Sequence, residues 1–147
     1  MKAVADRTNA GAAVSLMDLS LEAECFGAPI RVSDDEGPTG TGPVISTEVE
    51  EDERMAQAEA LAVPEIGAGR TQIYIDAIGK VMDMIEDRPV FAGVIGPFSL
   101  AGRLLDVTQS LIYCYEEPDM VHVVLEKCTE FIIRYINAYK AVGANGV

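Results

Sequence analysis

The chain has 147 residues, 49% of them hydrophobic, and a mean hydropathy of +0.18, which predicts one folded domain over residues 1–147 and argues against a disordered chain. Its formal net charge of −13 opposes binding to nucleic acid and to anionic membranes, because both require clustered Lys and Arg. No apolar run is as long as a membrane span, and residues 1–20 lack the continuous apolar segment of a signal peptide, so we expect a cytoplasmic protein.

The first predicted elements are a strand and a helix. Residues 10–18 are small and apolar, as in a strand buried on both faces, and residues 19–27 follow as a short helix that ends at Gly27. Residues 28–32 are expected to form a short strand. Residues 33–44 are rich in Gly and Pro and predict a surface loop, whose acidic opening from Ser33 to Gly37 we interpret as solvated surface.

Two helices are predicted next, and both are expected to cover a sheet. Thr47 and Glu50 match a capping box for a helix that runs through about Leu61. Residues 69–88 predict a second helix, because their apolar residues recur along one helical face. The residues of this face are Ile75, Ile78, Val81, Met82 and Ile85.

The last part of the chain repeats the order of strand and helix. Residues 89–96 predict a second buried strand, residues 98–106 the helix that it leads into, and residues 108–117 another short helix. Pro118 suits the first turn of a long amphipathic helix that ends near Gly143, and the residues after it look like the start of a further strand. This alternation predicts an α/β fold with parallel strands joined by right-handed crossovers.

Three segments of the sequence, in this order and spacing, resemble the uroporphyrinogen decarboxylase superfamily. They are residues 15–44, 94–105 and 113–147. The superfamily includes the decarboxylase of tetrapyrrole synthesis and zinc-dependent methyltransferases that exchange methyl groups between corrinoids and thiols. Its fold is a TIM barrel, which needs about 250 residues, so the resemblance implies that this chain is a partial (β/α) barrel.

The stretch Gly96-Pro97-Phe98-Ser99 is the first candidate binding site. In a TIM barrel the loops after the strand C-termini form the active-site face, so the resemblance implies that these residues lie at its mouth. Ser99 is expected to cap the next helix and to leave its first N–H groups for a substrate carboxylate or phosphate. A Gly-Pro turn with a capping serine and no ligand is the equally weighted alternative.

Asp18 is the first candidate catalytic residue. The resemblance matches it to the aspartate that, in the decarboxylase, binds the pyrrole N–H groups of the tetrapyrrole and stabilises the positive charge of the protonated ring. A carboxylate in a dry pocket supplies such fixed negative charge. From the residues alone, capping of the helix over residues 19–26 is the favoured role for Asp18.

Tyr115 is the second candidate catalytic residue. The resemblance matches it to the tyrosine that the decarboxylase places beside a substrate carboxylate, where a phenol can donate a hydrogen bond. A tyrosine in a short helix rich in aromatics is also typical of a core.

The cysteines and the histidine predict no metal site. Cys25, Cys114 and Cys128 are far apart and are expected to be buried free thiols. His122, the only histidine, has no Cys or acid at a recognisable ligand spacing, and we interpret it as structural.

Two branches of the superfamily remain possible, together with a non-catalytic alternative. Residues 17–24 and 96–102 resemble the corrinoid methyltransferases, whereas Tyr115 favours the decarboxylase. The resemblance places the zinc ligands of the methyltransferase beyond residue 147 and the substrate-binding arginines of the decarboxylase before residue 1, so we expect the chain alone to be inactive. The partners it implies are a corrinoid or tetrapyrrole substrate and a corrinoid protein. The alternative is an α/β module that binds a ligand or partner without catalysis.

A partial barrel also has consequences for assembly. It would leave the strand edges at residues 12–18 and 144–147 unpaired, together with an apolar face. We therefore expect a homo-oligomer rather than a stable monomer.

Overall fold

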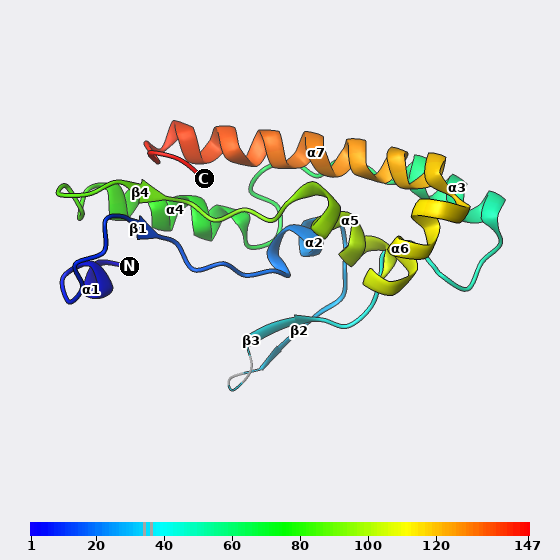
Figure 1. Ribbon diagram of the computed structural model, residues 1–147, viewed down its shortest axis with the longest axis horizontal. Coiled ribbons are helices and arrows are strands. Elements are labelled where there is room, and N and C mark those ends of the chain that lie inside the picture. The colour runs from blue at the N-terminus through cyan, green and yellow to red at the C-terminus, as the bar shows by residue number, and fades with distance from the viewer. Residues whose placement is uncertain (34, 36) are drawn as a thin grey trace.

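The computed structural model describes residues 1–33, 35 and 37–147. Figure 1 shows the longest helix, α7, lying along one side of the molecule, with the other elements beneath it. In chain order the elements are α1 (Lys2–Ala5), β1 (Ala13–Val14), α2 (Leu21–Cys25), β2 (Ile30–Ser33), β3 (Gly37–Gly40), α3 (Glu51–Ala60), α4 (Thr71–Met82), β4 (Val90–Phe91), α5 (Pro97–Leu105), α6 (Val107–Glu116) and α7 (Pro118–Ala141).

Two short strands, β1 and β4, pair in parallel, as the alternation of strands and helices predicts. Ala13 lies opposite Val90, and Gly146 near the C-terminus makes a further parallel bridge to Phe91. The Ala92 N–H donates to the Gly146 carbonyl, at 3.0 Å, so the expected strand at the end of the chain begins here. The three strand segments therefore lie side by side in chain order.

The prediction that residues 10–18 are a strand buried on both faces is wrong. The strand is two residues long, and only Ala13 lies in the core. Val14 is 61% exposed and Leu16 is 77% exposed. A strand's side chains alternate between its faces, so one face of this segment packs inward and the other faces solvent.

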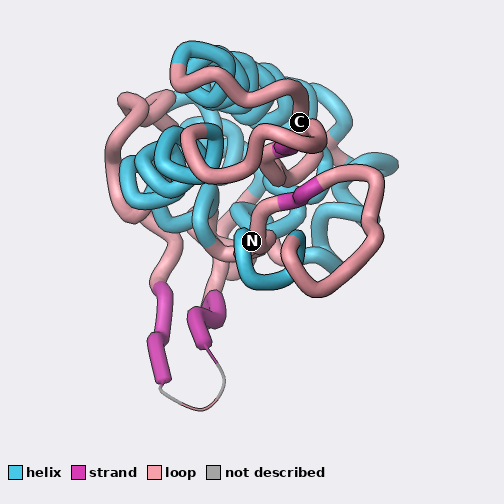
Figure 2. Tube along the Cα trace, turned by 90° about the vertical axis from the view of Figure 1, so that its left-hand side faces the viewer, coloured by secondary structure: helices cyan, strands magenta, loops and turns pink. Residues whose placement is uncertain are grey.

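The predicted surface loop at residues 33–44 is also wrong in part, because residues 37–40 form β3. This strand pairs antiparallel with β2, with Ile30 opposite Gly40 and Val32 opposite Pro38. A two-stranded ribbon has open edges, so a proline can lie in it without removing a bond of a central ladder. Figure 2 shows this hairpin projecting from the helical body. Asp34 and Glu36, from the acidic opening of the predicted loop, lie outside the described residues.

The helix predicted from Thr47 begins later than the capping box implies. Its first residue is Glu51, and Glu50 is the extended N-cap residue. Gln57, and not Glu50, bonds to the segment before the helix: its Oε1 accepts a hydrogen bond from the Ser46 N–H at 2.9 Å. The helix packs against α7 rather than a sheet, whereas α4 contacts both β4 and α7.

The long helix α7 organises the core. It begins at Pro118 and is followed by Gly143 with φ +94°, as the sequence predicts. Phe131 packs edge-on against Phe26 in one hydrophobic cluster, and Tyr135 and Tyr139 lie in the other. Among the described helices, none combines the length and the apolar character needed to cross a membrane.

Candidate functional site

The stretch Gly96-Pro97-Phe98-Ser99 follows β4 and opens α5. Gly96 is the extended N-cap residue and Pro97 begins the helix, because its fixed φ suits the first helical position. Ser99 therefore lies within the first turn, and the prediction that it caps the helix is wrong, since no side-chain cap is present. Its side chain is exposed.

A cleft of about 470 Å³ lies beside this stretch. It lies between the segment after β1, the segment after β4, and helices α5 and α6. Its apolar wall includes Met17, Leu19, Val94, Phe98 and Leu111, and Ser99 and Arg103 are among its polar members. The carboxyl-terminal ends of neighbouring parallel strands commonly form such ligand sites.

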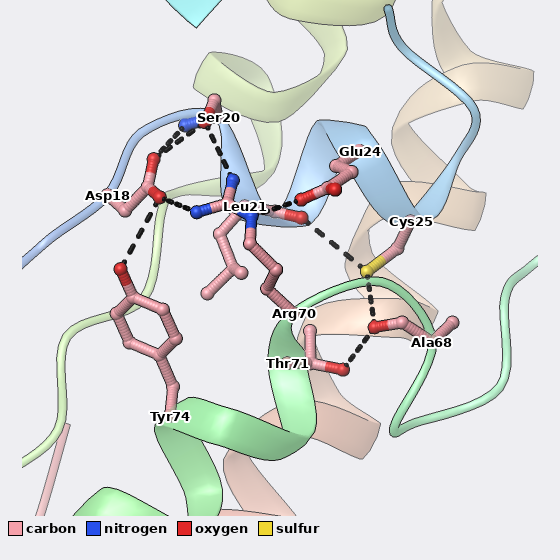
Figure 3. A network of polar contacts seen from close by, with 9 residues as sticks. All are labelled: Asp18, Ser20, Leu21, Glu24, Cys25, Ala68, Arg70, Thr71 and Tyr74. Atoms are coloured by element: carbon pink, nitrogen blue, oxygen red, sulfur yellow. Dashed lines mark hydrogen bonds and ion pairs between the residues drawn. The ribbon is translucent and has the colours of Figure 1, made fainter. Parts of the chain in front are cut away.

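Asp18 belongs to a polar network that also contains Ser20, Arg70 and Tyr74 (Figure 3). One carboxylate oxygen accepts hydrogen bonds from the Ser20 N–H at 2.9 Å and the Ser20 hydroxyl at 2.7 Å. The other oxygen pairs with Arg70 and accepts a bond from the Tyr74 hydroxyl at 3.3 Å. Arg70 also donates to Glu24 at 2.6 Å, so the network joins α2 to the start of α4.

The network sets the ionisation of Asp18. Burial alone would raise its pKa, but the hydrogen bonds from Ser20 and Arg70 outweigh burial, and the pKa of Asp18 is lowered. Burial of the Tyr74 side chain raises the pKa of its hydroxyl, and the negative charge of the neighbouring Asp18 raises it further. Asp18 is therefore an ionised carboxylate whose charge is balanced by a guanidinium.

Asp18 does not line the cleft beside Ser99. Its neighbours Met17 and Leu19 do so, while the Asp18 carboxylate faces Arg70 and Tyr74 on the side of α4. Asp18 and Ser99 both follow parallel strands at their C-terminal ends, but the structure does not bring their side chains into one pocket.

Tyr115 lies away from these groups. Its side chain is 90% exposed on α6, so the alternative interpretation of Tyr115 as a core residue is wrong. Tyr113, two residues earlier, takes the core position, and the Arg54 guanidinium lies 4.6 Å from its ring centroid. Tyr115 is not among the residues that line the cleft.

Glu22 is a buried carboxyl that the sequence reasoning missed. It is 3% exposed, and its Oε1 accepts a hydrogen bond from the Ile95 N–H at 3.1 Å. Its Oε2 is buried without a partner among the described residues. Burial raises the pKa of Glu22, against the Ile95 hydrogen bond that lowers it. Because Ile95 precedes Gly96, Glu22 anchors the segment that enters the candidate binding stretch. The available signal was an acid between the apolar residues Leu21 and Ala23 of the short helix α2.

The cysteines and His122 form no metal centre in the described part of the chain. Within it, no group of three or more His, Cys, Asp or Glu residues is placed to hold a metal ion. All three cysteines are free; Cys128 is buried and Cys25 partly buried, but Cys114 is exposed, against expectation. His122 lies exposed on α7.

Comparison with known proteins places this geometry in a family context. The family model "Uroporphyrinogen decarboxylase (URO-D)" matches residues 2–147. A uroporphyrinogen decarboxylase of Vibrio vulnificus strain YJ016 is 26% identical over 143 residues, an alignment that covers 92% of this chain and 38% of that protein. A methylated-thiol–coenzyme M methyltransferase of Methanosarcina mazei is 24% identical over 129 residues, which covers 87% of this chain and 33% of that protein.

Among solved structures, a methyltransferase from Methanosarcina mazei superimposes with a TM-score of 0.76 at 25% sequence identity. The superposition covers 91% of this chain and 38% of the methyltransferase. The chain thus spans little more than a third of the length of these relatives. Because the family model covers nearly every residue, the chain belongs to the uroporphyrinogen decarboxylase (URO-D) family.

Proposed function

We propose that this chain is part of a URO-D family methyltransferase that moves a methyl group from a methylcobamide to a thiol. The observation that carries the proposal is the ion pair between Asp18 and Arg70. Decarboxylation by the route that the resemblance implies needs an aspartate whose negative charge is free to stabilise a protonated pyrrole. Here Arg70 balances that charge, and Ser20 and Tyr74 occupy both carboxylate oxygens.

We further propose that the fold is a segment of a (β/α) barrel. In such a barrel each strand lies beside the one before it in the chain, which is the order of β1, β4 and the Gly146 bridge. The active-site face is formed by the segments after the strands. The cleft beside Ser99 opens among those segments and is the proposed site for the methyl acceptor.

The residues of the cleft would bind and orient the acceptor. Its apolar side chains, such as Leu19 and Phe98, exclude water from the reacting groups, and the Ser99 hydroxyl can hydrogen-bond the acceptor. Glu22 acts indirectly, because its bond to the Ile95 N–H holds the backbone that leads into Gly96. Asp18 and Arg70 position the segment that carries Met17 and Leu19.

The zinc ion implied by the resemblance to the methyltransferases does not fit the described residues, which offer no cluster of ligands for it. No step of the proposal therefore uses a zinc ligand from this chain. The cleft suits a small acceptor, and we assign the corrinoid, with any corrinoid protein that presents it, to parts of the enzyme outside these residues.

The second candidate is uroporphyrinogen decarboxylation, which the sequence match to the Vibrio vulnificus enzyme favours. The two activities are separated by assaying the product of the complete reading frame with methylcobalamin plus coenzyme M, and in parallel with uroporphyrinogen. We expect a methylated thiol and no loss of carboxyl groups. Turnover of uroporphyrinogen without methyl transfer would overturn the proposal.

The variant Asp18→Asn tests, in the same assay, whether Asp18 positions a segment or stabilises a transition state. If Asp18 only positions a segment, the variant should keep methyl transfer within about tenfold of the parent, whereas loss of a charge that stabilises a transition state costs about 100-fold or more. Asp6→Asn is the control, because Asp6 pairs with Lys2 on the surface. A loss above 100-fold in Asp18→Asn alone would contradict the positioning role.

A further inference from the structure

Glu22 is a buried carboxyl without a counter-ion. It is 3% exposed, and its neighbours in α2 belong to the two different hydrophobic clusters, Leu21 to one and Ala23 to the other. Among the described residues, no Arg or Lys forms an ion pair with it. An ionised carboxylate in such surroundings lacks the compensation that a buried charge needs.

The hydrogen bonds of Glu22 are incomplete as well. Its Oε1 accepts a bond from the Ile95 N–H at 3.1 Å, whereas its Oε2 is buried without a partner among the described residues. A neutral carboxyl keeps an oxygen that can accept the bond from Ile95, so this bond requires no charge. A negative charge shared by both oxygens would leave Oε2 without a donor. The site therefore stabilises the protonated form, in agreement with the pKa of Glu22, which burial raises.

The groups around Glu22 supply little positive charge. The titratable groups of the surrounding elements whose charges interact with it are Asp18, Cys25, Tyr74, Arg103, Tyr135 and Tyr139. Asp18 adds a like charge, and Arg103, the one cation of this set, has the smallest of five influences on the pKa of Glu22. The three tyrosines and the cysteine are neutral at pH 7, because burial raises their pKa values. Arg70 of α4 is paired with two other carboxylates.

Few backbone hydrogen bonds fix the segment over residues 93–96, which connects β4 to α5 and passes α2 (Figure 1). The parallel pairing ends at the Ala92 N–H, which donates to the Gly146 carbonyl. Among the described residues, the next bond between backbone groups along this connection is donated by the Leu100 N–H to the Gly96 carbonyl, at 2.9 Å. Segments with few such bonds open at a lower free energy than packed helices.

Two side chains hold this segment instead. The Ser15 hydroxyl oxygen accepts a bond from the Gly93 N–H at 2.7 Å, and Glu22 accepts the bond from the Ile95 N–H. Ile95 and the residues on either side of it line the cleft of about 470 Å³ beside Ser99. Movement of the segment would therefore change both the burial of Glu22 and the wall of the cleft.

We infer that Glu22 is a pH-sensitive switch for the cleft beside Ser99. In its protonated form it keeps residues 93–96 in place, and in its ionised form it favours an open state in which these residues move and water reaches the carboxylate. Hydration removes the cost of the unpaired buried charge, and a segment with few backbone bonds moves readily to admit water. Any effect on methyl transfer rests on the proposed function, whereas the switch itself depends only on the described residues.

The direction of the switch follows from proton linkage. Because the pKa of Glu22 in the closed state is raised above the ordinary value of 4.5, protonation favours the closed state at low pH. This preference is lost as the pH rises from 4.5 through the raised pKa.

The test is amide hydrogen exchange of the parent chain, measured by NMR between pH 4 and pH 8 and corrected for the intrinsic pH dependence of exchange. We expect the opening constants at Gly93 and Ile95 to rise by about threefold or more over this range. The amides of Phe131 and Ile132 in the core of α7 report on global unfolding and should change less. A carbon-13 titration of the Glu22 carboxyl in the folded chain should give the pKa at which the rise in opening levels off.

Substitutions identify the residue responsible. Glu22→Gln keeps an oxygen that accepts the bond from Ile95 and removes the ionisation, so opening at Ile95 should no longer change with pH. Glu22→Ala removes the acceptor as well, and opening at Ile95 should exceed that of Glu22→Gln at every pH. Glu126→Gln, which neutralises an exposed carboxyl on α7, is the matched control and should keep the pH profile of the parent.

Three results would overturn the inference: opening at Ile95 that is independent of pH in the parent, a pH dependence that persists in Glu22→Gln, or an equal rise at Phe131 and Ile132. The exchange measurement needs no catalysis. A pH-dependent opening without methyl transfer in the full-length assay would therefore count against the proposed function alone. Methyl transfer together with pH-independent opening would count against the switch alone.

Discussion

Asp18 and Arg70 are 52 residues apart in the chain, and their ion pair joins the segment after β1 to the start of α4. The Asp18 side chain is 6% exposed and that of Arg70 is 23% exposed, so solvent screens the pair only in part. Tyr74 and Glu24 extend the contact on either side.

The first prediction is a strong energetic coupling between Asp18 and Arg70. In a double-mutant cycle with Asp18→Asn and Arg70→Met, we expect a coupling of about 1–3 kcal/mol in the free energy of unfolding, because each single change leaves a partly buried charge without its partner. The exposed pair of Lys2 and Asp6 is the control and should couple by less than about 1 kcal/mol. Equal coupling in the two cycles would show that the buried network adds no stability beyond that of an exposed ion pair.

The same pair predicts a pH dependence. Folding lowers the pKa of Asp18, so the ionised carboxylate stabilises the folded state at pH values above the ordinary pKa of 3.8. This contribution to the free energy of unfolding is lost as the pH falls below that value. Urea unfolding of the parent and of Asp18→Asn should therefore converge in stability as the solution is acidified. A constant difference down to the acid limit of folding would contradict the lowered pKa.

Glu22 predicts the opposite pH dependence. Its pKa is raised by burial, so the folded state favours the protonated form, and stability falls as the pH rises above the ordinary value of 4.5. Glu22→Gln removes this titration and should gain in stability over the parent across that range. Glu126→Gln, an exposed change on α7, serves as the control. The expectation fails if the parent and Glu22→Gln keep a constant difference from pH 4 to pH 8.

The cysteines should differ in their rates of alkylation. Burial raises the pKa of Cys25 to about 11 and that of Cys128 to about 12. At pH 8 their thiolate fractions are then about a thousandth or less, whereas Cys114 is exposed to the reagent. Brief treatment with iodoacetamide, followed by mass spectrometry, should label Cys114 first. Labelling of Cys128 at the same rate would mean that the core around α7 opens readily.

Lys127 should stabilise the C-terminus of α3. Its Nζ donates to the carbonyls of Ala58, Glu59 and Leu61 at 2.8, 2.5 and 2.6 Å. Lys127→Met removes a cation from the end of a helix where carbonyls lack partners, and we expect a loss of about 1–2 kcal/mol in the free energy of unfolding. Amide exchange in α3 should accelerate. Lys140→Met, also on α7, is the control; an equal loss there would exclude a specific cap.

Self-association should depend on an exposed apolar region. Leu16 is 77% exposed and Ile73 is 64% exposed, and both border a cleft of about 380 Å³. Contiguous exposed apolar surface favours association, so light scattering should report a mass above 15.7 kDa that increases with concentration. The double change Leu16→Gln and Ile73→Gln should lower that mass, while Val32→Gln on the hairpin should not. A constant mass of 15.7 kDa would contradict the expected homo-oligomer.

The elements that the sequence predicts best are those with local signals. Helix α7 has a long apolar periodicity between Pro118 and Gly143, and each of these residues marks an end by its own backbone chemistry. The pairing of β2 with β3 has no such signal, because the Gly and Pro residues of β3 indicate a turn, and only contact with the partner strand makes them a strand.

The candidate site also combines features that local sequence signals predict with contacts between distant residues that they do not. The position of the stretch from Gly96 to Ser99 after a parallel strand follows from local sequence, and the structure agrees. The partners of Asp18 do not follow from it, because Arg70 and Tyr74 are more than 50 residues away, and no spacing rule relates them. The same holds for Glu22 and Ile95, which lie 73 residues apart.

Helix α7 contributes to both hydrophobic clusters, and the ring centroids of Phe131 in one and Tyr135 in the other are 6.0 Å apart. Neither cluster can lose its packing without disturbing the helix that supports the other. The two clusters should therefore melt in one cooperative transition, in which calorimetric and van't Hoff enthalpies agree. A helix-breaking change between Phe131 and Tyr135 would then lower the melting temperature of the whole molecule and would not divide its unfolding into two steps.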